Sequence, residues 1–136
     1  MGWLKKLLWR ISGEGRYLTL EQIHQILFGY DFFTVEKGDW EDGGAFTLLN
    51  DRVGVYYLKT KVAENVYTET FDIHALGYRG GALITFVDDQ LKALILNGIE
   101  QDVSILNKVD RQRLWQMLLK VRQAVVVFEE EKMEKE

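Results

Sequence analysis

The sequence contains no cysteine and no proline, and each absence removes a class of structure. Without cysteine the chain has no disulfide framework, no thiolate metal site and no cysteine nucleophile. This composition is typical of a reducing compartment, and we expect a cytoplasmic protein. Without proline there is no proline-fixed turn or cis bond, so the turns depend on the 12 glycines together with Asn and Asp.

Long hydrophobic runs are also missing, since no stretch approaches the roughly 18 consecutive apolar residues of a membrane-spanning helix. The N-terminal residues do not have the order of a signal peptide, because Lys5, Lys6 and Arg10 interrupt the apolar residues instead of preceding them. Met1 and Gly2 begin a myristoylation pattern, but Lys6 stands where Ser or Thr is required. We therefore expect neither a membrane span nor a targeting segment.

The composition that is present is that of a single globular domain of 136 residues. Hydrophobic residues make up 47% and charged residues 28%, which decides against wholesale disorder. The net charge of −4 is unevenly spread, because residues 1–20 and 111–128 are basic and residues 21–110 are acidic. An acidic body disfavours nucleic acid as a partner, because phosphate neutralisation dominates that affinity.

The most informative stretch spans residues 80–106 and predicts three consecutive antiparallel strands. Asn97 and Gly98 separate two apolar runs, and Asn-Gly is the strongest short-range hairpin signal because both residues tolerate the positive φ of a type I′ turn. Residues 88–90 form the preceding turn.

The whole chain predicts an α+β protein, an antiparallel seven-stranded meander with two N-terminal helices and one long C-terminal helix. We expect helices in 1–29, an antiparallel β domain with its C-terminal helix in 30–128, and a frayed acidic tail in 129–136. Thr19 and Gln22 form a capping box at the start of the second helix. The expected strands are 31–35, 45–49, 52–61, 66–76, 80–87, 91–96 and 99–105.

The C-terminal helix, expected over 110–128 with Asn107 as its cap, has two apolar arcs. One arc must cover the sheet, and the other contacts the N-terminal helices or a partner. The first arc contains Leu114, Leu118, Val121, Val125 and Phe128, and the second contains Trp115, Leu119 and Val126, with Arg122 between them.

Residues 2–11 predict a short amphipathic helix with two alternative roles. Trp with Lys and Arg beside a leucine face is typical of a helix that lies on a membrane surface, yet a helix of this length also packs commonly on its own domain. The apolar arc contains Trp3, Leu4, Leu7, Leu8 and Ile11, and the other arc contains Lys5, Lys6, Trp9 and Arg10.

Three sets of polar residues are candidates for a site of chemistry. The acidic, Gly-rich loop of residues 36–44 offers oxygen ligands, but it lacks the spacing of a calcium loop, so we expect a solvated hairpin loop. Asp72 and His74 lie side by side on one strand, but nothing local marks a nucleophile for them. His24 has no second ligand at helical spacing. We expect no catalytic residue, no metal and no cofactor.

The order of elements and several local motifs resemble the pleckstrin homology superfold. The resemblance implies two packed orthogonal sheets with a C-terminal helix that plugs one open end, a scaffold that often binds proteins. Phosphoinositide-binding members of this superfold carry several Lys and Arg residues around the first hairpin. The corresponding hairpin of this chain has Lys37 among acids, so we do not expect it to bind phosphoinositides. The motifs are Trp40, Phe46 with Leu48, the run Tyr56, Tyr57, Leu58 and Lys59, and Trp115 followed by Leu118 and Leu119.

These observations together predict a non-catalytic protein-binding module, a small adaptor or inhibitor that docks on a larger protein. A phage or mobile-element protein that acts on a host enzyme would have this character. The alternative is a peripheral membrane module anchored by residues 2–11. The residues expected to contact the partner are Trp3, Lys5, Lys6, Trp9, Arg10, Asp39, Trp40, Glu41, Asp42, Arg111, Arg113, Trp115, Leu119 and Arg122.

Overall fold

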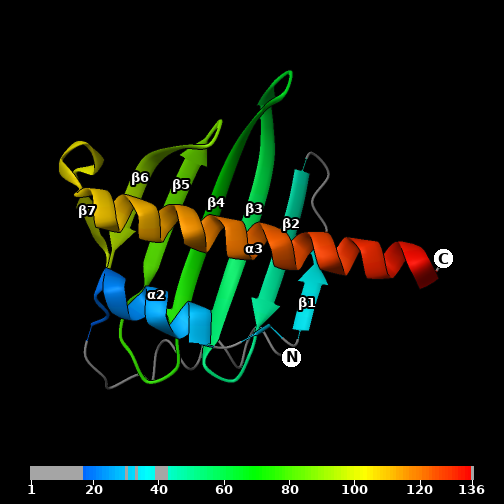
Figure 1. Ribbon diagram of the computed structural model, residues 1–136, viewed down its shortest axis with the longest axis horizontal. Helices are drawn as coiled ribbons and strands as arrows, with labels where there is room; N and C mark the ends of the chain where they lie inside the picture. The colour runs from blue at the N-terminus through cyan, green and yellow to red at the C-terminus, as the bar shows by residue number, and fades with distance from the viewer. Residues whose placement is uncertain (1–16, 30, 33, 39–42, 136) are drawn as a thin grey trace.

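Seven strands form one sheet, and two helices cover one of its faces (Figure 1). This computed structural model describes residues 17–29, 31–32, 34–38 and 43–135. The predicted helix of residues 2–11 and the acidic residues 39–42 lie outside them. The elements are α2 (Leu20–Gly29), β1 (Thr34–Lys37), β2 (Gly43–Leu49), β3 (Val53–Ala63), β4 (Val66–Ala75), β5 (Ala82–Val87), β6 (Gln90–Leu96), β7 (Ile99–Gln101), the 3-10 helix η1 (Val103–Ile105) and α3 (Lys108–Lys135).

The strands lie in the order in which the sequence makes them, and each pair of neighbours is antiparallel. This confirms the predicted antiparallel meander. The turn between β6 and β7 has positive φ angles at Asn97 and Gly98, 54° and 80°, as a type I′ turn requires. Asp88 and Asp89 also have positive φ in the turn before β6.

The sheet is a single open layer, which corrects the barrel or sandwich of two packed sheets that the superfold resemblance implied. Each strand pairs only with its neighbours in sequence, and among the described residues no pairing joins β1 to β7. The helix α3 does not plug the end of a barrel. It runs across the face of the sheet from β7 to β1 and continues beyond β1 (Figure 1).

Several element boundaries differ from those expected. β1 begins at Thr34 and includes Lys37, so part of the expected loop is strand. The last strand stops at Gln101, because the Asp102 side chain accepts a hydrogen bond from the Ser104 amide and caps η1. At its other end α3 continues to Lys135, past the end expected at Phe128.

Both described α-helices begin at the predicted caps. At α2, the Gln22 amide donates to Thr19 Oγ1 (3.1 Å) and the Thr19 amide donates to Gln22 Oε1 (2.9 Å). This is the reciprocal capping box that the sequence predicted. At α3, the Asp110 amide donates to Asn107 Oδ1 at 2.8 Å. These bonds satisfy backbone N–H groups that have no partner inside their helices.

The first apolar arc of α3 covers the sheet, which settles the alternative that the sequence left open. Leu114, Leu118 and Val121 are fully buried, whereas Leu119 and Val126 of the second arc are exposed. Hydrophobic side chains from the helix-facing side of the sheet complete the core. They include Phe46, Leu48, Val53, Val55, Phe71, Ile73, Ile84, Phe86 and Leu94.

A buried carboxylate fixes α3 to the middle of the sheet. Glu69 on β4 is only 3% exposed, and it accepts hydrogen bonds from Arg122 Nε at 2.7 Å and from the Tyr57 hydroxyl at 2.5 Å. The Arg122 guanidinium also contacts Asp89 in the turn before β6. Because buried ions are stable only when they are paired and hydrogen-bonded, this group defines one position of α3 on the sheet.

The same contacts set the protonation states in the cluster. Burial by itself raises the pKa of Glu69, but the hydrogen bonds from Arg122 and Tyr57 and the charge of Arg122 hold that pKa below its usual value. Burial and the adjacent carboxylate raise the pKa of Tyr57, so its hydroxyl keeps the proton that it donates. Glu69 is therefore ionised and Tyr57 neutral near neutral pH.

Candidate protein-docking surface

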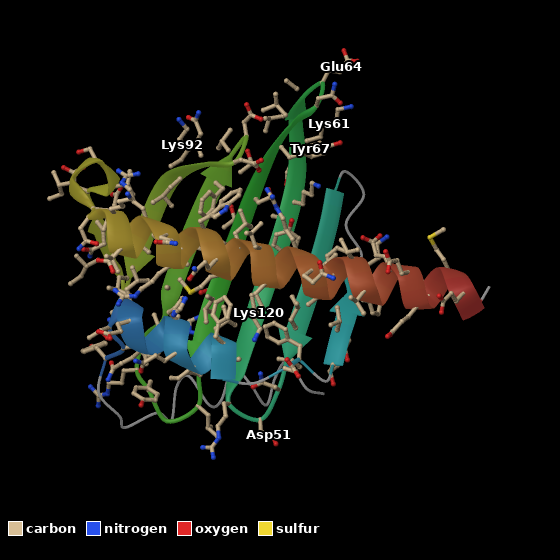
Figure 2. The ribbon with its side chains drawn as sticks, in the orientation of Figure 1. Asp51, Lys61, Glu64, Tyr67, Lys92 and Lys120 are labelled. Carbon is tan, nitrogen blue, oxygen red and sulfur yellow. The ribbon has the colours of Figure 1, made fainter. Side chains whose placement is uncertain are left out.

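A groove with a volume of about 930 Å³ opens between α3, the end of α2 and the segment that leads into β1. α2 lies beside the first half of α3, where His24 Nε2 is 2.9 Å from Gln116 Oε1. The groove continues along α3 where α2 ends, and Lys120 marks this place in Figure 2. The lining residues are Phe28, Asp31, Phe32, Thr34, Val35, Gln116, Leu119, Lys120, Gln123, Ala124, Val127, Phe128 and Glu131.

The groove presents large apolar side chains to solvent. Phe28 is 44% exposed, Leu119 43% and Val127 40%, and all three belong to the lining. Val35 and Phe128 lie deeper and pack against the hydrophobic core. Single exposed apolar residues are ordinary on a protein surface, but a group that shares one concave surface is typical of an interaction site.

One cation, Lys120, lies among the aromatic side chains of the groove. Its ammonium is 5.0 Å from the centre of the Phe28 ring and 6.0 Å from that of Phe32. Burial lowers the pKa of Lys120, and the negative charge of Asp31 opposes this shift. With Asp31 and Glu131 also in the lining, the described residues give the groove two acids and one base.

The three arginines of α3 that were predicted to contact a partner make contacts within the chain. Arg111 donates to the carbonyl oxygens of residues 103 and 106, next to η1. Arg113 pairs with Asp110 at 2.8 Å and lies 3.8 Å from Glu21, while Arg122 holds the buried Glu69. Their role in partner binding stays a prediction, and reversing their charges would disturb the fold as well as any interface.

The other predicted contact residues are divided between the core, the groove and the undescribed segments. Trp115 is half-buried, with its ring 5.9 Å from Phe86 and 5.6 Å from the Arg122 guanidinium. Leu119 lies in the groove. Nine of the fourteen lie outside the described residues, namely Trp3, Lys5, Lys6, Trp9, Arg10, Asp39, Trp40, Glu41 and Asp42.

Sequence reasoning missed most of the groove, because its walls come from three separate segments. Phe28 lies in the last turn of α2, Phe32 precedes β1, and Val127 belongs to the second half of α3. One signal was available. Residues 125–128 are four consecutive apolar residues on a helix, and no single face can bury four neighbours in a row. At least one of them had to face away from the sheet.

Asp72 and His74 lie side by side on the face of the sheet opposite the helices, as the strand pattern predicted. His74 Nε2 is 2.8 Å from Asp72 Oδ1, and His74 Nδ1 is 2.9 Å from the Gly80 carbonyl oxygen. The ring therefore connects β4 to the segment that leads into β5. Within the described part of the chain, no three His, Asp or Glu side chains gather as metal ligands.

Gly81→Ala should lower the free energy of unfolding by about 1–3 kcal/mol, the usual cost of forcing extra volume into a packed site. The added Cβ would lie 2.2 Å from the Ile73 carbonyl oxygen and 2.6 Å from His74 Nδ1, so backbone must move. Urea denaturation measures the effect. Gly29→Ala is the matched control, since a Cβ there meets nothing within 4 Å. Equal midpoints for the two variants would contradict the prediction.

A scan against protein-family models found no matching family, and searches of curated proteins and of solved structures found no match. What the structure establishes is a class of fold, a seven-stranded antiparallel sheet with a long C-terminal helix. No helix among the described residues is long and apolar enough to cross a membrane. The membrane-anchor alternative depends on residues 2–11, which are not described, and it stays a prediction.

Proposed function

We propose that this protein is a non-catalytic protein-binding module, an adaptor or inhibitor that docks on a larger protein through the groove beside α3. The observation that carries the proposal is the group of exposed apolar side chains in that groove, Phe28, Leu119 and Val127. Burying such a group against a partner removes apolar surface from water, which is the main favourable term in protein association.

The fold supports the same function. The order of seven antiparallel strands and a C-terminal helix is consistent with the pleckstrin homology superfold, although the sheet here is open and α3 crosses its face. Members of that superfold often bind proteins along the helix or at a strand edge. The proposed surface is of this type, because it lies along α3 and reaches β1.

Val127→Lys should weaken docking strongly while leaving the fold intact, because it places a charge among the exposed apolar side chains of the groove. Val109→Lys is the matched control. Val109 is 55% exposed on the same helix, but it lies outside the groove lining. We expect a partner isolated on the wild-type protein to bind the Val127→Lys protein at least about tenfold more weakly, and the control within about twofold.

The measurement is the dissociation constant of the purified partner for each immobilised protein, with thermal melts to show that both variants fold. A partner that loses affinity only for the Val127→Lys protein supports the groove as the docking surface. A partner that binds both variants equally, or weakens equally with both, contradicts it.

A further inference from the structure

The groove adjoins an unpaired strand edge. β1 is an outer strand of the sheet, and on its outer side it pairs with no strand that the structure describes. Thr34 and Val35 of β1 themselves line the groove. A ligand in the groove therefore lies next to the backbone of β1, and exposed strand edges are sites where an additional strand can pair.

The direction of the β1 backbone groups follows from one hydrogen bond. The Gly38 amide donates to the Ala45 carbonyl oxygen at 2.7 Å, so Gly38 faces β2. In an antiparallel ladder, alternate residues face the same neighbour. Glu36 and Thr34 therefore also face β2, and Val35 and Lys37 direct their N–H and C=O groups outward. These two residues offer the pattern of donors and acceptors that a further strand needs.

The side chains of an added strand would reach the groove. Val35 stands opposite the buried Leu48, so both lie on the helix-facing side of the sheet. Phe128 lies on the same side, 6.1 Å from the Phe46 ring. Every second side chain of an added strand would continue this layer beside Val35 and Phe128. The alternate side chains would face the opposite side of the sheet.

The charge around this edge is acidic. Among the described residues that line the groove, Asp31 and Glu131 are acids and Lys120 is the base, while the charges of Glu36 and Lys37 on β1 cancel. Figure 1 shows the last turns of α3 extending beyond β1. Four of the charged residues in those turns are acids, Glu129, Glu130, Glu131 and Glu134, against the bases Lys132 and Lys135. A strand that enters this space gains from carrying Lys or Arg.

We propose that the partner contributes an extended segment of alternating apolar and basic character, which pairs with β1 as an eighth strand and places its apolar side chains in the groove. The inference rests on the proposed function and goes beyond it, because it assigns the binding mode to the backbone of β1. The other outer strand, β7, has only the three residues Ile99–Gln101, and none of them lines the groove. β7 therefore supplies a matched control edge.

Proline tests the backbone pairing directly, because it removes one N–H group and is tolerated where that group points away from the sheet. Val35→Pro removes an outward donor of β1. Glu100→Pro does the same at β7. Ile99 flanks the two-residue turn and faces Leu96 of β6, so the next residue, Glu100, directs its N–H group away from β6. Lys37→Pro is a second outward position on β1, and thermal melts identify the variants that fold.

The probe is a phage-displayed library of random peptides of about nine residues, selected on the immobilised full-length chain, with the enriched peptides then synthesised. We expect alternating apolar and basic residues in them. In fluorescence anisotropy, Val35→Pro or Lys37→Pro should weaken binding about tenfold, and Glu100→Pro should change it less than twofold. Glu131→Lys should weaken binding at low salt and have a smaller effect at high salt.

The outcomes separate this inference from the proposed function. Peptides that lose affinity for the Val127→Lys protein but bind the folded β1 proline variants normally overturn the added strand and leave the groove as a docking surface. Enriched peptides with helical spacing of apolar residues, or with acidic residues, also overturn it. If the library yields no peptide whose binding depends on either the groove or β1, the inference fails and the proposed function loses its support.

Discussion

Arg122→Leu should lower the free energy of unfolding by about 3 kcal/mol at neutral pH, because it leaves a buried carboxylate without its cation. Glu69 is almost inaccessible to water and would keep only the Tyr57 hydroxyl as a hydrogen-bond donor from a side chain. The Leu side chain retains much of the packing of the aliphatic Arg stem, so the loss of stability reports mainly on the missing cation. Urea denaturation of both proteins measures it.

The double variant Arg122→Leu with Glu69→Gln is the matched control for this effect. Gln keeps an acceptor for the Tyr57 hydroxyl but carries no charge, so the double variant should recover part of the lost stability. If the double variant is less stable than Arg122→Leu alone, the stranded charge is not the cause of the loss.

The pH dependence gives a second check on the same pair. The pKa of Glu69 is lower in the folded protein than its usual value of 4.5, so the ionised form stabilises the wild-type fold above that value. This contribution is lost as the pH falls through the lowered pKa. In Arg122→Leu, burial is no longer offset by the arginine, and protonation relieves the stranded charge. The variant should therefore be closer to the wild type at about pH 4 than at about pH 7. An equal difference at both values would contradict this.

Phe86→Ala should lower the free energy of unfolding by about 3–5 kcal/mol, the usual cost of removing a buried aromatic ring. Phe86 on β5 is 3% exposed. Its ring lies 6.3 Å from that of Phe71 in a stacked arrangement and 5.9 Å from Trp115 of α3. The substitution therefore leaves a cavity between the sheet and the helix, where both neighbours lose contacts.

Phe28→Ala is the matched control for Phe86→Ala. The same atoms are removed, but Phe28 is 44% exposed in the groove, so the expected loss is about 1 kcal/mol or less. Chemical denaturation of both variants in one buffer makes the comparison. Similar losses for the two would show that the ring between sheet and helix is less important than its burial indicates.

The parts of the fold that could be predicted from the sequence are those encoded by neighbouring residues. Asn97 and Gly98 define a type I′ turn by their own tolerance of positive φ. The caps of both described α-helices involve residues three apart. The stripe of α3 that begins at Leu114 repeats every three or four residues, and it is the stripe that the core buries.

The parts that could not be predicted depend on residues far apart in the chain. Closure of the sheet depends on twist and on pairing between β1 and β7, and no local motif encodes either of them. Arg122 was expected to face a partner, but it contacts Glu69, which is 53 residues away in the sequence. The groove could not be predicted for the same reason. Phe28 and Val127 line one groove only after α2 and α3 have packed together.

The position of α3 after all seven strands has a consequence for how the chain is made. Each strand pairs with the strand before it, so hairpins can form while the ribosome is still synthesising the rest. α2 is made before the strands, but the part of the helix-facing side that α3 covers stays bare until Leu114 and the residues after it emerge. A premature stop codon between β7 and α3 would therefore yield a chain that can pair its strands and keep α2, but presents a partly uncovered apolar sheet to chaperones and to other copies of itself.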